Sequence, residues 1–311
     1  MTTPQGLQRL RADRTSGATT LGDSAIDIVE AFIATQQLQE PQQFAAALEK
    51  LVREILKAQP SMAVMLNLVQ CVLEACADDA PFSGMKQRVQ QALSEFRRAL
   101  RLSMEALCRQ AIEILPPHAT VLTYSNSTTV TAVLHHARAE GHLDRVFLSE
   151  ARPAYDGRPL AGSLAEAGVE IDYSTDMGLF AKLREADLVV LGADAVFPLY
   201  FLNKIGTHAL AELAQVRNVP CFALCTASKF LPTAAAGLLR ISKHSGDEVW
   251  STSAPGVRVH NDYFEEIPLS LLDGVVSDQG RHSPEAIRGM LDERPLSPAL
   301  LRLRAGSDMA G

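Results

Sequence analysis

The stretch ADLVVLGADAVFPLYFLNKIGTHALAELAQVRNVPCFALCTA, residues 186–227, alternates two apolar runs with a helical pattern. The first apolar run ends at Leu191, the helical pattern starts at Asn203, and the second apolar run starts at Val219. Both runs are apolar on both faces, which is typical of strands in a parallel sheet covered by helices on each side. The stretch therefore predicts a βαβ unit of a parallel sheet.

The same rhythm fills most of the chain after the double proline at residues 116–117. Further apolar runs at 119–125, 145–150 and 169–174 are each followed by a helical stretch, and strand starts recur roughly every 25 residues. This spacing predicts an α/β fold with a Rossmann-like parallel-sheet domain over residues 116–311.

Residues 1–115 have a helical pattern instead. Helices are expected at 19–35, 40–59, 61–77 and 83–116, the last one ending at the double proline. The second has an apolar stripe through Phe44, Leu48 and Leu51, and the third is apolar nearly all round, which predicts a buried central helix. We therefore expect a helical N-terminal domain at 1–115, followed by the α/β domain.

Composition excludes several functional classes. With 311 residues, 47% of them hydrophobic, the chain can bury the core of one large or two modest domains. A net charge of −7 argues against a direct nucleic-acid partner, and no apolar run approaches the ~18 residues of a membrane span. The first 17 residues lack the apolar core of a signal peptide. Five cysteines without a CxxC pair predict a reduced, cytoplasmic protein without disulfides or a zinc site.

Polar residues follow the first expected strand of the α/β domain. Ser125, Asn126 and Ser127 lie between that strand and the next helix. In doubly wound folds, ligands bind beyond the carboxyl ends of strands. Hydroxyl groups and free backbone N–H groups at a helix start favour an anion such as phosphate. The alternative interpretation is an ordinary helix N-cap.

A second group of candidates follows the strand at 145–150. Arg152 lies just beyond that strand and can hold a carboxylate or a phosphate with its guanidinium fork. Asp156 and Arg158 flank Gly157, where a surface turn is the simpler expectation.

The third group follows the strand that ends at Leu191. A carboxylate such as Asp194 at a sheet end can act as a general acid or base. Asn203 can hydrogen-bond a hydroxyl group, and Lys204 and Lys229 can meet a phosphate. The alternative is that Asp194 caps a turn and Lys204 faces solvent. No histidine spacing indicates a metal site and no GxGxxG is present, so no metal or cofactor is expected.

These segments also carry a resemblance. The GAD at 192–194 and the NKIGT at 203–207 are similar to the GAD…NKxGT signature of a superfamily. That superfamily unites the regulatory subunits of initiation factor 2B with methylthioribose-1-phosphate isomerase and ribose-1,5-bisphosphate isomerase. Further similar segments lie at 14–26, 58–69, 149–176 and 261–280, so the resemblance covers nearly the whole chain. It implies a helical N-terminal domain, a Rossmann-like C-terminal domain and a homodimer.

The resemblance also implies roles for single residues. In the isomerases, an open-chain aldose phosphate becomes a ketose phosphate, with a Cys and an Asp as the catalytic pair. Asp194 matches the Asp, but Ser125 occupies the place of the Cys. A serine hydroxyl is a far weaker acid than a thiol and is poorly suited to move a proton near neutral pH.

Two phosphate loops of the family lack their arginines here. The residues that match the Arg-Gly-Ala loop are Ser16, Gly17 and Ala18, with serine in place of the arginine. The Arg-Pro-Thr/Ser loop is matched by Gln59 and the two residues after it. Each loss removes a charge-assisted contact worth about 1.5–3 kcal/mol.

Three hypotheses follow. The favoured one is an initiation-factor-2B-like protein that binds a small phosphorylated metabolite, a sugar phosphate or a nucleotide, and lacks the standard isomerase activity. The alternative is an aldose–ketose sugar-phosphate isomerase that uses Asp194. A third is a scaffold whose helical domain and sheet edge mediate association.

Overall fold

The computed structural model describes residues 2–13, 16–38, 40–76, 82–241, 244–251 and 254–305. Packing groups the chain into two compact units, and each is considered by itself. The first comprises Met1–Leu102, Leu231–Arg240 and Glu293–Gly311, and the second comprises Ser103–Phe230 and Ile241–Asp292. The domain boundary expected at residues 115–116 stays a prediction, because compact packing is a different property from independent folding.

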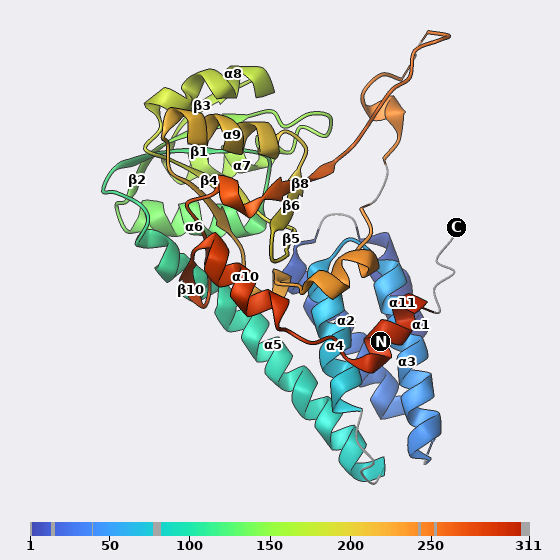
Figure 1. The fold of residues 1–311 in the computed structure, drawn as a ribbon. Coiled ribbons are helices and arrows are strands. Elements are labelled where there is room, and N and C mark those ends of the chain that lie inside the picture. Colours follow the sequence, from blue (N-terminus) through green and yellow to red (C-terminus); the bar gives the residue numbers. More distant parts are fainter. Residues whose placement is uncertain are drawn as a thin grey trace. The chain divides into compact units, whose positions relative to one another are not determined.

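The first unit is helical, as expected (Figure 1). The helix α3 begins with a proline at its first position, where the missing N–H costs nothing. Its stripe of Phe44, Leu48 and Leu51 is buried, which confirms the predicted apolar face. The helix α4 is buried at almost every position, which confirms the predicted central helix. The elements of this unit are α1 (Thr3–Ala12), α2 (Ala18–Thr35), α3 (Pro41–Ala58), α4 (Ala63–Ala75), the first part of α5 (Phe82–Ile112), the 3₁₀ helix η3 (Thr233–Leu238) and α11 (Pro298–Ala305).

The second unit is built on a seven-stranded sheet with the order β10-β9-β7-β4-β1-β2-β3. All neighbouring strands are parallel except β10, which pairs with β9 in antiparallel fashion. This mostly parallel sheet confirms the predicted fold class. The strands are β1 (Ala119–Thr123), β2 (Leu143–Ser149), β3 (Glu170–Ser174), β4 (Leu188–Gly192), β7 (Cys221–Leu224), β9 (Gly274–Ser277) and β10 (Gly280–His282).

Helices cover both faces of this sheet (Figure 1). One face packs on the end of α5, on α6 (Thr128–Ala139) and on α7 (Gly157–Glu166). The other packs on α8 (Asp176–Ala181), α9 (Thr207–Arg217) and α10 (Pro284–Asp292). Successive side chains of β4 alternate between the two cores, with Val189 in one and Val190 in the other. That alternation explains why the central strands are apolar at every position.

A second, antiparallel sheet corrects one prediction. Asn203 and Lys204 were expected to start a helix, but they end the strand β6 (Tyr200–Lys204). This strand pairs with β5 (Ala195–Val196) on one side and with β8 (Phe264–Pro268) on the other. Gly206 then turns the chain with a φ of 99°, and α9 begins at the next residue. Short 3₁₀ helices complete the unit: η1 (Lys182–Glu185), η2 (Ala227–Lys229), η4 (Gly246–Glu248) and η5 (Leu269–Leu271).

In the part of the chain that the structure describes, none of the helices has the length and apolarity needed to cross a membrane.

Candidate functional site

The candidate site lies where the strand order of the main sheet reverses. The strands β1 and β4 are adjacent and parallel, with Thr123 beside Val190. From β1 the chain continues toward β2 and β3 on one side, and from β4 it continues toward β7 and β9 on the other. Loops that leave such a pair of strands diverge and open a crevice at their carboxyl ends. Ser125, Asn126 and Ser127 follow β1, and Asp194 follows β4.

The loop after β1 leads directly into α6. Ser125 is buried and has a φ of 67°, in the left-handed region that few residues other than glycine adopt. Ser127 is the N-cap of α6, and its hydroxyl accepts a hydrogen bond from the Val130 backbone at 3.4 Å. Asn126 is exposed between them. The N-cap interpretation is therefore right for Ser127, while the helix start still presents backbone N–H groups beyond it.

Gly192 shows that the loops converge. A Cβ added to Gly192 would lie 2.7 Å from the Ser127 side chain and 3.8 Å from the Asn203 amide oxygen. The end of β4 therefore touches the start of α6 and lies beside the end of β6. Asn203 is buried and donates from its amide to the Thr207 hydroxyl at 3.1 Å.

Asp194 lies among positively charged groups. Its backbone N–H donates to the Leu202 carbonyl at 2.8 Å, which joins the end of β4 to the second sheet. Burial raises the pKa of its carboxyl, and the Lys229 and Lys204 ammonium groups oppose that rise. Lys229 is buried and donates to the Ala193 carbonyl at 2.5 Å. The arrangement provides a carboxyl group that can hold a proton, next to two cations.

Lys204 is buried, which rules out the alternative that it faces solvent. Its ammonium group donates to the Asp156 carboxylate at 2.9 Å and lies 4.0 Å from the ring centroid of Tyr263. Asp156 therefore forms an ion pair with a buried lysine, a role beyond the surface turn expected from the sequence. Glu265 supports the same region, because its carboxylate accepts from the Gly206 and His208 backbones at 2.7 and 2.9 Å.

Arg152 lies in the loop between β2 and α7. It donates to the Tyr155 hydroxyl at 2.8 Å and to the Val249 carbonyl at 3.5 Å. Asp176 holds the start of this loop, because its carboxylate accepts hydrogen bonds at 2.7–2.9 Å from the Ser149 hydroxyl and from the Ala151 and Arg152 backbones.

The remaining predicted ligand residues belong to the first unit. Gly17 is the N-cap of α2, with Ala18 as the first helical residue, and the Ser16 backbone donates to Asp13 at 2.9 Å. Gln59, where the resemblance implies an arginine, donates its side-chain amide to the Leu10 and Asp13 carbonyls. Gln59 thus anchors the end of α1, and the role of residues 16–18 in ligand binding stays a prediction.

Sequence reasoning missed four residues that organise the second unit's site. Tyr263 and Glu265 lie in the segment 261–280, and Asp176 ends the segment 149–176, and the sequence marks these positions only by the resemblance. Asp156 was assigned to a surface turn. The roles of these four residues follow from their contacts with residues that are distant in the sequence.

Among the described residues, no group of three His, Cys, Asp or Glu side chains is placed to hold a metal ion. The five cysteines are free, and burial raises the pKa of Cys225, beyond the end of β7, to about 12. That thiol is a weaker acid than an ordinary cysteine and is poorly suited to move a proton near neutral pH.

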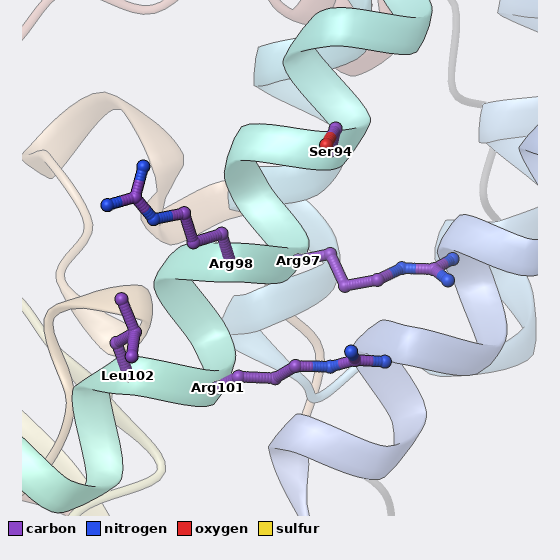
Figure 2. A pocket seen from close by; sticks show the side chains of 5 residues that line it. All are labelled: Ser94, Arg97, Arg98, Arg101 and Leu102. Carbon is purple, nitrogen blue, oxygen red and sulfur yellow. The ribbon is translucent and has the colours of Figure 1, made fainter.

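A separate cavity of about 350 Å³ lies on α5 in the first unit. Figure 2 shows Arg97 and Arg101 extending toward a neighbouring helix, while Arg98 lies on the opposite side. Arg97 is already paired, at 2.7 Å from Asp27 and 3.1 Å from Glu30. None of the predicted site residues lines this cavity, whose lining is Ser94, Arg97, Arg98, Arg101 and Leu102.

Comparison with known proteins agrees with the fold and the motifs. The model of the initiation factor 2 subunit family matches residues 14–284. The ribose 1,5-bisphosphate isomerase of Methanocaldococcus jannaschii is 26% identical over 273 residues, 86% of this chain and 87% of that protein. The methylthioribose-1-phosphate isomerase of Heliobacterium modesticaldum is 27% identical over 276 residues, 81% of this chain and 80% of that protein. The solved structure of the Pyrococcus horikoshii OT3 translation initiation factor eIF-2B has a TM-score of 0.75 at 23% identity, covering 91% and 97% of the two chains.

Proposed function

The chain belongs to the initiation factor 2 subunit family, and on that premise we propose that it binds a small phosphorylated metabolite. The ligand is a sugar phosphate or a nucleotide, and it occupies the crevice beyond β1 and β4. The observation that carries this proposal is the convergence of Asp194 with the buried cation Lys229 and with the Lys204–Asp156 ion pair beyond the sheet. The start of α6 supplies backbone N–H groups for a phosphate at the same edge.

We also propose that the protein lacks the standard isomerase activity, because Ser125 stands where the resemblance implies the catalytic cysteine. Ser125 is buried on a turn with a φ of 67°, and burial raises the pKa of each of the five cysteine thiols, so none of these is a ready source of a thiolate. The arginines of the two family phosphate loops are also absent, at Ser16 and Gln59. A binding site that serves assembly or a partner contact is consistent with these losses.

One observation favours the alternative, an aldose–ketose isomerase of the ribose-1,5-bisphosphate or methylthioribose-1-phosphate type. Burial raises the pKa of the Asp194 carboxyl, which moves it toward the range in which a general acid or base works near neutral pH. An isomerase that used Asp194 would need a second acid in place of a thiol.

Two measurements separate these functions. Turnover of both isomerase substrates is assayed in wild type and in Asp194→Asn, and robust turnover lost in the variant would establish the isomerase. A thermal-shift series with sugar phosphates and nucleoside monophosphates tests binding, since a ligand at 100 times its Kd adds about 2.7 kcal/mol of stability. No shift with any of these compounds would favour the scaffold.

We further propose a cytoplasmic homodimer without a direct nucleic-acid partner. The net charge of −7 and the free cysteines support this setting. Light scattering at micromolar concentration should give twice the mass of the chain, and a monomer would contradict the assembly.

A further inference from the structure

The buried ammonium group of Lys204 already has its anion. Lys204 is 3% exposed, and its Nζ lies 2.9 Å from an Asp156 carboxylate oxygen. A buried cation requires such a counter-charge, because leaving water without one costs several kcal/mol. The pair is neutral as a whole, so Lys204 adds little net positive charge to the crevice.

Asp156 is held in this position by its loop. Asp176 accepts hydrogen bonds from the Ala151 and Arg152 backbones and fixes the loop start. At the loop end, Gly157 packs so closely that an added Cβ would lie 1.8 Å from the Ser149 carbonyl oxygen. Moving the Asp156 backbone away from Lys204 would require this tightly packed turn to shift.

Tyr263 closes another side of the Lys204 ammonium group. Its ring centroid lies 4.0 Å from Nζ, in the geometry of a cation–π contact. The ring is itself fixed, because its hydroxyl donates to Glu248 at 2.6 Å and its face stacks on His244 at 3.6 Å between centroids. A phosphate that sought Lys204 would therefore have to displace the carboxylate, not merely enter an open position.

We propose that Asp156 is a specificity-determining residue that fills the anion position of Lys204, so that the site accepts ligands with one phosphate group rather than two. This inference rests on the proposed binding function and narrows its ligand class. A second phosphate near Lys204 would meet the negative charge of Asp156, and like charges in a partly buried site repel strongly. The first phosphate retains the backbone N–H groups at the start of α6.

Calorimetric titration of the full chain compares ribose 5-phosphate and adenosine monophosphate with ribose 1,5-bisphosphate. Wild type should bind a monophosphate at least as tightly as the bisphosphate, and Asp156→Asn should gain tenfold or more for the bisphosphate. The two monophosphates distinguish a sugar from a nucleotide. Wild-type binding of the bisphosphate tenfold or more tighter than of both monophosphates would overturn the proposal.

Inorganic phosphate tests the Lys204 position without assuming a ligand. Phosphate should raise the Tm of Asp156→Asn more than that of wild type, and the added Lys204→Met change should abolish the gain. Asp172→Asn is the matched control. It also removes one carboxylate from an ion pair, with Arg145, in the same unit, and neither residue belongs to the candidate site. Asp156→Gln serves if the asparagine variant does not fold.

The two proposals fail in different ways. A phosphate response of the Asp156 variants no larger than that of Asp172→Asn would overturn the role of Asp156. The other outcome is a clear rise in Tm with phosphate in the Asp156 variants, while wild type binds no sugar phosphate or nucleotide. That outcome would overturn the proposed binding function, and Asp156 would remain the group that fills the anion position of Lys204.

Discussion

A Cβ added to Gly157 would lie only 1.8 Å from the carbonyl oxygen of Ser149. The turn between β2 and α7 therefore has no room for a side chain at that position. We expect Gly157→Ala to displace the loop that carries Arg152 and Asp156 and to lower the free energy of unfolding by about 1–3 kcal/mol, as overpacking does. Urea denaturation measures this loss.

Gly162 of the same helix is the matched control. Nothing lies within 4 Å of a Cβ added there, so Gly162→Ala should raise the free energy of unfolding by about 0.5–1 kcal/mol through helix propensity. A Gly157→Ala protein as stable as wild type would contradict the close contact with Ser149.

Glu265 and Glu266 are neighbours on β8 with different roles. The Glu265 carboxylate accepts hydrogen bonds from the Gly206 and His208 backbones at the start of α9. Glu265→Ala should therefore cost about 1–3 kcal/mol of unfolding free energy, as charged hydrogen bonds do. Glu266 is exposed, so Glu266→Ala should stay within about 0.5 kcal/mol of wild type. Equal effects in chemical denaturation would disprove the capping role.

The strands β1 and β4, where the strand order of the main sheet reverses, could be predicted because their sequence signals are local. Each apolar run such as Leu188–Gly192 lies between helical stretches, and burial on both faces leaves it apolar throughout. The strand β6 could not be predicted in this way. Its strand state depends on pairing Lys204 with Phe264, 60 residues later, and local spacing carries no trace of that pairing.

The residues of the candidate site also differ in whether their roles depend on local sequence or on distant contacts. Asp194 was predictable because it directly follows a buried strand. The partner of Lys204 was not, because Asp156 lies 48 residues earlier, in a loop whose Gly157 suggests only a turn. The contacts of Tyr263 and Asp176 likewise join distant segments, so their roles depend on the fold as a whole.

The raised pKa of Asp194 predicts a pH-dependent stability. Burial raises the pKa of this carboxyl above its ordinary value of 3.8, so between the unfolded and folded pKa values the folded state binds more protons. By linkage, this group's contribution to stability is greatest below pH 3.8 and declines as pH rises through the folded pKa.

Asp194→Asn removes that titration. The variant should be more stable than wild type at neutral pH, and its stability should fall less between pH 4 and pH 7, as measured by chemical denaturation across that range. Identical pH profiles for the two proteins would contradict a raised pKa at Asp194. If wild type turns over a sugar phosphate, the same variant should lose that activity.

Ser125→Cys tests whether the missing thiol is what limits catalysis. General acid–base groups contribute about 10²–10⁴-fold to rate, so the variant should convert methylthioribose 1-phosphate at least about 100-fold faster than wild type. Adding Asp194→Asn should remove the gain, because the resemblance implies that the cysteine and Asp194 act as a catalytic pair. Ser270→Cys is the control for an added thiol, since Ser270 is exposed in η5, among residues outside the candidate site. A Ser125→Cys protein no more active than Ser270→Cys would show that the serine at position 125 alone does not explain an absent isomerase activity. That result would direct attention to Ser16 and Gln59, where the resemblance implies arginines.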